Sequence, residues 1–165
     1  MYNNNYINIS IFGLLLVSKL TSSFLNMSPF LATIIIGSYF IINKFHLLTM
    51  VLFVQFISDL VFGSHLSNIF VYISYFLIIL TLYYTNKDFS VVSSFISALY
   101  VNIIFFSISN FGHFISYSET YTLTSLSDTY FTGLSFGGNL LFSTLFFVSI
   151  YHSLLAVRKK QLAKN

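Results

Sequence analysis

The scarcity of charged side chains is the feature that most limits what this chain can fold into. Its 165 residues include only seven Lys or Arg and four Asp or Glu, whereas 56% of them are apolar. A soluble domain carries about 25% charged residues, because its surface must face water. Most of the outer surface of this chain is therefore expected to face lipid, as in an integral membrane protein.

Continuous apolar runs recur along the whole chain. A transmembrane helix needs about 20 mostly apolar residues to cross a hydrocarbon core of about 30 Å, whereas a membrane β-barrel would show alternating apolar and polar residues. The runs therefore predict an all-α fold, a compact bundle of six transmembrane helices that forms a single domain over residues 1–165. The expected helices cover residues 7–25, 29–42, 47–62, 69–84, 89–111 and 134–157.

Polar breaks separate these runs. Pro29 lies at a predicted helix start, where the missing N–H of proline costs nothing, and Gly63 opens the polar break after the third run. Residues 112–133 form the one long polar segment, which we expect to be an outer loop. Residues 158–165 form a basic tail after the last run, which we expect to be cytoplasmic.

The basic residues sort to one side of the predicted bundle. Lys44, Lys87 and the basic tail follow the second, fourth and sixth expected helices, so they share one face. The positive-inside rule makes this face cytoplasmic. We therefore expect a multi-pass protein of the bacterial inner (plasma) membrane, with both termini in the cytoplasm. Lys19 is the exception; it lies toward the outer end of the first helix, where its side chain could snorkel outward.

The acidic residues Asp59, Glu119 and Asp128 fall at or near the opposite, outer face. A charged group inside a membrane is costly, so Asp59 is a functional-site hypothesis by default. The alternative is a structural role, in which Asp59 caps its helix or pairs with Lys19. The sequence leaves both interpretations open.

Other polar groups near the expected outer face also allow two interpretations. Asn110 could bind a ligand or satisfy a loop carbonyl. The aromatic segment 117–124 could be an interfacial tyrosine belt or a lid over an outward-facing pocket. Gly133 and Gly137 form a small-xxx-small pair, which mainly indicates close helix packing.

Known catalytic and nucleotide-binding motifs are absent from the sequence. It contains no GxSxG, HExxH, paired-aspartate or Walker motif, so we expect no enzyme activity, no catalytic residue, no cofactor and no nucleic-acid partner. The absence of cysteine excludes disulfides and thiolate metal sites. Asp59, His65 and His113 are residue types that bind metals, but their spacing matches no known metal motif, so no metal site is expected.

Several short strings follow one another in a recognisable order. They are Asn26-Met27-Ser28-Pro29, Gly37-Ser38-Tyr39-Phe40, Ser58-Asp59-Leu60 with Gly63 and His65, Val71-Tyr72-Ile73-Ser74-Tyr75, Ser109-Asn110-Phe111-Gly112, Tyr121-Thr122 and Gly138-Asn139-Leu140-Leu141. This ordered set resembles a family of uncharacterised bacterial membrane proteins described as S components of energy-coupling factor (ECF) transporters. Two differences stand out: the first helix lacks an AxxxA docking pattern, and Asn139 replaces an acidic residue of the family.

The resemblance implies a six-helix, lipid-embedded subunit that captures a vitamin-like small molecule from outside. A coupling membrane subunit and a pair of ATPases would supply the energy. We expect the site among the outer helix ends, with residues 26–28 and 117–124 gating access. The candidate substrate-binding residues are Asp59, His65, Tyr72, Tyr75, Asn110, His113, Tyr121 and Thr122.

Two other functions remain open at this point. The Gly133–Gly137 pair is compatible with a non-transporting protein that assembles with partners through its helix faces. A self-sufficient ion-coupled carrier is the other alternative. Carriers place ionisable groups near the middle of the membrane, and the sequence puts none convincingly there.

Overall fold

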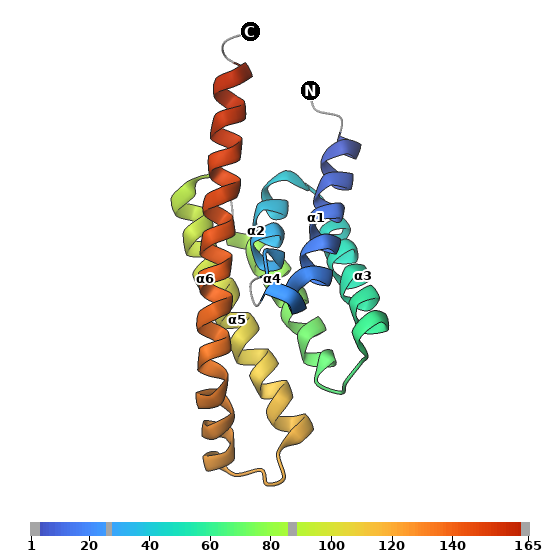
Figure 1. Ribbon diagram of the computed structural model, residues 1–165, viewed down its shortest axis with the longest axis vertical. Coiled ribbons are helices and arrows are strands. Elements are labelled where there is room, and N and C mark those ends of the chain that lie inside the picture. Colours follow the sequence, from blue (N-terminus) through green and yellow to red (C-terminus); the bar gives the residue numbers. More distant parts are fainter. Residues whose placement is uncertain (1–3, 26–27, 86–88, 163–165) are drawn as a thin grey trace.

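The computed structural model describes residues 4–25, 28–85 and 89–162, which form helices joined by short turns. The helices are α1 (Asn4–Leu25), α2 (Phe30–Phe40), α3 (Lys44–Phe62), α4 (Asn68–Thr85), α5 (Val91–Tyr117) and α6 (Leu123–Leu162). They pack side by side into one bundle (Figure 1). The predicted all-α fold is therefore confirmed for the described residues.

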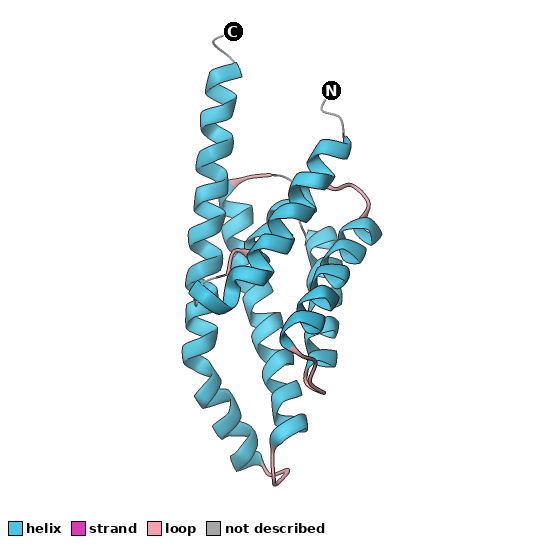
Figure 2. Ribbon diagram, turned by 45° about the vertical axis from the view of Figure 1, so that its right-hand side comes forward, coloured by secondary structure: helices cyan, strands magenta, loops and turns pink. Residues whose placement is uncertain are grey.

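The two ends of the bundle differ in what they carry. The α3–α4 turn (residues 63–67) and the α5–α6 turn (residues 118–122) lie at one end, which we call the hairpin end (Figures 1 and 2). The first and last described residues lie at the opposite end, the termini end (Figure 1). Lys44 opens α3 at the termini end, whereas Asp59 is close to the end of α3 at the hairpin end.

Four of the helices are long and apolar enough to cross a membrane. They are α3, α4, α5 and residues 123–156 of α6. Large apolar side chains lie on the surface of the bundle; Val92 is 69% exposed, Ile103 64% and Phe142 63%. Soluble monomers rarely expose large contiguous apolar patches. Helix length and surface together indicate a membrane protein.

The α1–α2 hairpin does not reach the hairpin end of the bundle. α2 has 11 residues, so it is about 16 Å long, roughly half of the hydrocarbon thickness. Ser28, just before α2, accepts a hydrogen bond at its carbonyl from the Ser143 hydroxyl at 2.9 Å, near the middle of α6. By its length, α2 is too short for the full span that the sequence predicted.

Local signals explain where several helices begin and end. The side chain of Asn43 accepts a hydrogen bond from the Phe45 N–H at 2.9 Å, which caps the start of α3. Gly63 has a φ of 93°, a conformation that favours glycine, and α3 ends immediately before it. Pro29 directly precedes α2. The predicted breaks at Pro29 and Gly63 are confirmed.

The structure replaces the loop expected over residues 112–133 with two helix ends. α5 continues to Tyr117 and α6 begins at Leu123, so only residues 118–122 connect them. The reason is a reciprocal cap: Thr122 N–H donates to Ser125 Oγ at 3.1 Å, and Ser125 N–H donates to Thr122 Oγ1 at 3.2 Å. At the other end of the chain, α6 continues to Leu162, so the tail expected over 158–165 is helical that far.

Glycines set the close approach of α5 and α6. A Cβ on Gly137 would lie 2.6 Å from Phe106 Cδ2, and a Cβ on Gly133 would clash with the Asn110 side chain. Both partners are on α5. The small-xxx-small pair therefore packs inside the chain.

This packing predicts that alanine substitution lowers stability at only one of two adjacent glycines of α6. Gly137→Ala would push a methyl group into the Phe106 ring and should cost about 1–3 kcal/mol of unfolding free energy. Gly138→Ala is the matched control, because a Cβ there meets nothing within 4 Å. Thermal unfolding of the two variants in detergent measures the difference. Equal midpoints for Gly137→Ala and the control would contradict the packing.

Candidate functional site

The carboxylate of Asp59 is held by three neutral hydrogen-bond donors. Gln55 Nε2 donates to Asp59 Oδ1 at 2.6 Å, and Asn68 Nδ2 donates to the same oxygen at 2.9 Å. The hydroxyl of Tyr72 donates to Asp59 Oδ2 at 2.7 Å. Gln55 precedes Asp59 by one helical turn in α3, and Asn68 and Tyr72 are one turn apart in α4. The α3–α4 hairpin therefore builds this arrangement from both of its arms.

Lys19 of α1 approaches the same region from the other side. Its Nζ donates to the Tyr75 hydroxyl at 3.2 Å and lies 5.1 Å from the Phe30 ring centre and 5.7 Å from that of Tyr75. Aromatic faces attract an ammonium group electrostatically, most strongly where water is excluded. Tyr75 itself is only 2% exposed. The outward snorkelling considered for Lys19 is therefore wrong, because the bundle offers its ammonium two rings and a hydroxyl.

Tyr72 and Tyr75 bring the acid and the base close together. They lie three residues apart on α4, so they share one face of that helix. Tyr72 bonds to Asp59 and Tyr75 to Lys19, and the charge of Asp59 acts on Lys19. We call these six residues the Asp59 cluster: Lys19, Gln55, Asp59, Asn68, Tyr72 and Tyr75.

Gln55 carries an acceptor that has no partner. The side chain is 4% exposed, and its Oε1 is buried without a hydrogen bond to any described residue. The bond from Nε2 to Asp59 fixes which end of the amide faces the carboxylate. A buried unpaired acceptor costs about 1–3 kcal/mol, so its presence calls for an explanation.

Sequence reasoning identified half of this cluster. Asp59, Tyr72 and Tyr75 were candidates, whereas Gln55 and Asn68 were missed. The signal for Gln55 was available in the sequence, since it lies four residues before Asp59 in the same predicted helix. Asn68 lies four residues before Tyr72 but was assigned to the break before the predicted helix 69–84, whereas α4 begins at Asn68.

Two candidates have exposed side chains that are not part of the cluster. His65 is exposed in the α3–α4 turn, and His113 is exposed on α5 with its ring centre 4.8 Å from that of Tyr117. Among the described residues, no group of three or more His, Cys, Asp or Glu side chains could hold a metal ion.

The remaining candidates serve the α5–α6 hairpin. Asn110 Nδ2 donates to the Phe106 carbonyl of its own helix at 2.8 Å, rather than to a loop. Tyr121 donates to the Ile115 carbonyl at 3.2 Å, and Thr122 caps α6. Local side-chain bonds to nearby backbone explain these positions. The segment 117–124, considered as a lid, thus consists of two helix ends and a short capped turn.

The second expected gate, residues 26–28, is described only in part. Residues 26 and 27 lie outside the described residues. The Ser28 hydroxyl donates to the Ser18 carbonyl at 3.4 Å, and its own carbonyl is bonded to Ser143. Ser28 is therefore tied to both α1 and α6.

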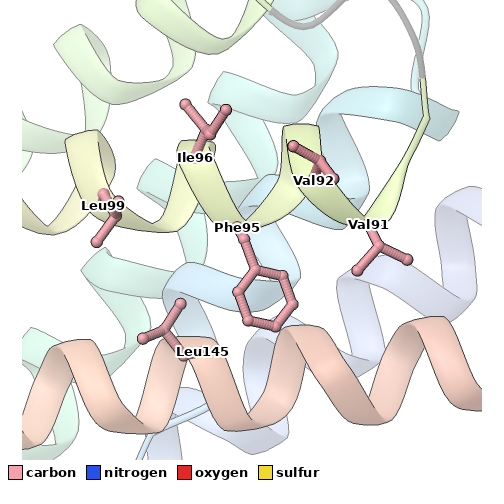
Figure 3. Close-up of a pocket in the computed structure, with 6 residues that line it drawn as sticks. All are labelled: Val91, Val92, Phe95, Ile96, Leu99 and Leu145. Carbon is pink, nitrogen blue, oxygen red and sulfur yellow. The ribbon is translucent and has the colours of Figure 1, made fainter.

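An apolar pocket of about 440 Å³ lies between α5 and α6 and shares no lining residue with the Asp59 cluster (Figure 3). It is lined by Val91, Val92, Phe95, Ile96, Leu99 and Leu145. Small-molecule sites add a few polar groups that orient the ligand, and none of these side chains is polar. Ile96 is 56% exposed. The pocket is therefore a groove of the lipid-facing surface, not an extension of the polar site.

The hydrogen bond from Tyr72 to Asp59 predicts a measurable loss of stability. Tyr72→Phe keeps the ring but removes a bond to a charged group, which should cost about 1.5–3 kcal/mol of unfolding free energy. Tyr84→Phe is the control, because Tyr84 is 70% exposed. Chemical unfolding in detergent measures both variants. Indistinguishable stabilities would mean that the bond to Asp59 contributes nothing.

No curated protein and no solved structure matches this chain. Residues 2–165, nearly the entire sequence, match a family of unknown function. The chain therefore belongs to the family of unknown function DUF6580.

Proposed function

We propose that this chain is the substrate-capturing membrane subunit of an uptake transporter for a vitamin or similar micronutrient, as in ECF S components. The observation that carries the proposal is the Asp59 carboxylate, which is bonded by three donors in an apolar bundle, with Lys19 held by Tyr75 one turn further along α4. Ionisable groups in such surroundings are expensive, and they mark substrate or ion sites in membrane proteins. In this role the chain captures a substrate and has no enzyme activity of its own.

The distribution of charge supports an outward-facing site. Lys44 is at the termini end, whereas Asp59 and the α5–α6 turn with Glu119 are at the hairpin end. By the positive-inside rule, the termini end is cytoplasmic and the hairpin end faces outward across the bacterial inner membrane. The Asp59 cluster then lies in the outer half of the protein, where a captured molecule arrives.

We also propose a topology of four full spans and one hairpin. α3, α4, α5 and α6 cross the membrane, while α1 and α2 enter from the cytoplasmic side and turn beside the middle of α6. Irregular backbone at this depth is tolerated where protein buries it, and Ser18 and Ser143 are 2% and 0% exposed. This topology keeps both termini in the cytoplasm.

The absence of cysteine allows a clean test of this topology. Single variants Ser64→Cys in the α3–α4 turn and Asn43→Cys before α3 should differ in intact cells: a membrane-impermeant maleimide should label only the first. Ser28→Cys should stay unlabelled, because Ser28 is bonded to Ser143 near the middle of α6, at membrane depth. Labelling of Asn43→Cys would contradict the orientation, and labelling of Ser28→Cys would indicate six full spans.

The structure supports the ion-coupled carrier as an alternative and weakens the case for an assembly role. The assembly role was motivated by Gly133 and Gly137, but both pack against α5 of the same chain. A self-sufficient ion-coupled carrier gains support from the acid and the base of the Asp59 cluster, which Tyr72 and Tyr75 hold on one face of α4, since carriers use ionisable groups inside the membrane. Uptake by the purified chain alone in proteoliposomes would favour a carrier. A requirement for a coupling subunit and ATPases would favour an S component.

The proposal predicts a specific role for the Asp59 charge in capture. Candidate vitamins are offered one at a time, in radiolabelled form, to purified protein, and we expect one of them to be retained. Asp59→Asn should lower its affinity at least tenfold, because a carboxylate is lost from the site. Asp128→Asn is the matched control, since Asp128 is exposed on α6. Unchanged affinity in Asp59→Asn would exclude this site, and retention of none of the vitamins would count against the proposed function.

A further inference from the structure

The Asp59 cluster is dipolar, with acceptors at one end and an ammonium at the other. At the first end are the Asp59 carboxylate and the unpaired Gln55 Oε1. At the second end is Lys19, on the Tyr75 hydroxyl. Tyr72 and Tyr75, which hold the two ends, are separated by three residues, or about 4.5 Å along the axis of α4. A ligand that matches both ends must itself be short and dipolar.

The acceptor end has capacity for further donors. Among the described residues, Asp59 Oδ1 receives two hydrogen bonds and Oδ2 receives one, from Tyr72. Gln55 Oε1 receives none from the described residues. An ionised carboxylate offers about four lone-pair positions and an amide oxygen two. A group with several N–H donors, such as an ammonium, is what this end would bind.

The charges of the cluster exclude ligands of a single sign. One acid and one base nearly balance each other, so a cationic ligand gains at Asp59 but is repelled by Lys19, and an anionic ligand meets the opposite problem. A zwitterion places each of its charges beside the opposite charge of the protein. Burial strengthens this discrimination, because Tyr75 is 2% exposed and Gln55 4%.

Resting on the proposed function, we infer that the captured substrate is a short zwitterion. Its ammonium binds Gln55 Oε1 and Asp59, and its carboxylate binds Lys19. Because Tyr72 is half-buried and Tyr75 is almost fully buried, the carboxylate end lies deeper in the bundle. Gln55 and Lys19 are then the specificity-determining residues, one for each end of the substrate.

A set of three small probes tests this inference on the full chain in lipid nanodiscs. The probes are β-alanine, ethylamine, which lacks the carboxylate, and propionate, which lacks the ammonium. Calorimetric titration should show β-alanine binding at least tenfold more tightly than either of the other two. Equal affinities for the three, or no binding of β-alanine at millimolar concentrations, would overturn the inference.

Two variants assign the ends of the ligand. Lys19→Met should reduce the affinity for β-alanine towards that for ethylamine, and Gln55→Met should reduce it towards that for propionate. Asn68→Leu is the matched control for Gln55→Met, because each variant removes one hydrogen-bond donor to Asp59 Oδ1. Only Gln55→Met also removes the acceptor Oε1. Asn68→Leu should therefore lose less affinity than Gln55→Met. Equal losses in these two variants would contradict the assignment of Oε1.

Two further measurements distinguish a failure of this inference from misfolding of a variant and from a failure of the proposed function. Thermal midpoints show whether a variant is folded, and Lys19→Gln replaces Lys19→Met if the latter is not. If a vitamin binds the unaltered chain but β-alanine does not displace it, the zwitterion inference fails while the proposed function stands. If β-alanine binds as described but no transport occurs even with a coupling subunit and ATPases, the inference stands and the proposed function fails.

Discussion

A carboxylate inside an apolar bundle must be hydrogen-bonded, and the way Asp59 meets this requirement organises much of the structure. Its donors come from both arms of the α3–α4 hairpin, Gln55 on one and Asn68 and Tyr72 on the other. One turn further along α4, Tyr75 receives Lys19 and so connects α1 to the same helix. Asp59, which is only partly buried, and the Lys19–Tyr75 bond together connect three helices and give the bundle a polar region near its hairpin end.

The sequence predicted the helices well where continuous apolarity marks them. The bounds of α3 and α4 agree with the apolar runs to within a few residues, because Asn43 and Gly63 give local start and stop signals. The segment 112–133 was predicted to be a loop because of its polar composition, but most of it is helical, and Thr122 and Ser125 cap the start of α6. The depth of the α1–α2 turn was not predictable, since it depends on a tertiary bond between Ser143 and Ser28.

The candidate site shows the same division between local and tertiary information. Asp59, Tyr72 and Tyr75 come together because a tight hairpin places α4 beside α3. Asn110, Tyr121 and Thr122 satisfy backbone groups of the α5–α6 hairpin instead. All of these residues were expected near the outer face of the membrane, but position along the membrane does not determine which way a side chain points. The inward position of Lys19 depends on rings from α2 and α4, which no local pattern reveals.

The claim that the Asp59 cluster captures a small molecule can be tested most directly with what the protein carries from the cell. The unaltered chain and Asp59→Asn are purified in parallel from a native-like host in mild detergent, and their small-molecule contents are compared by mass spectrometry. The account predicts one compound that is enriched with the unaltered chain and lost from the variant, although both remain folded. A compound retained equally by both, or no enriched compound with either, would contradict it.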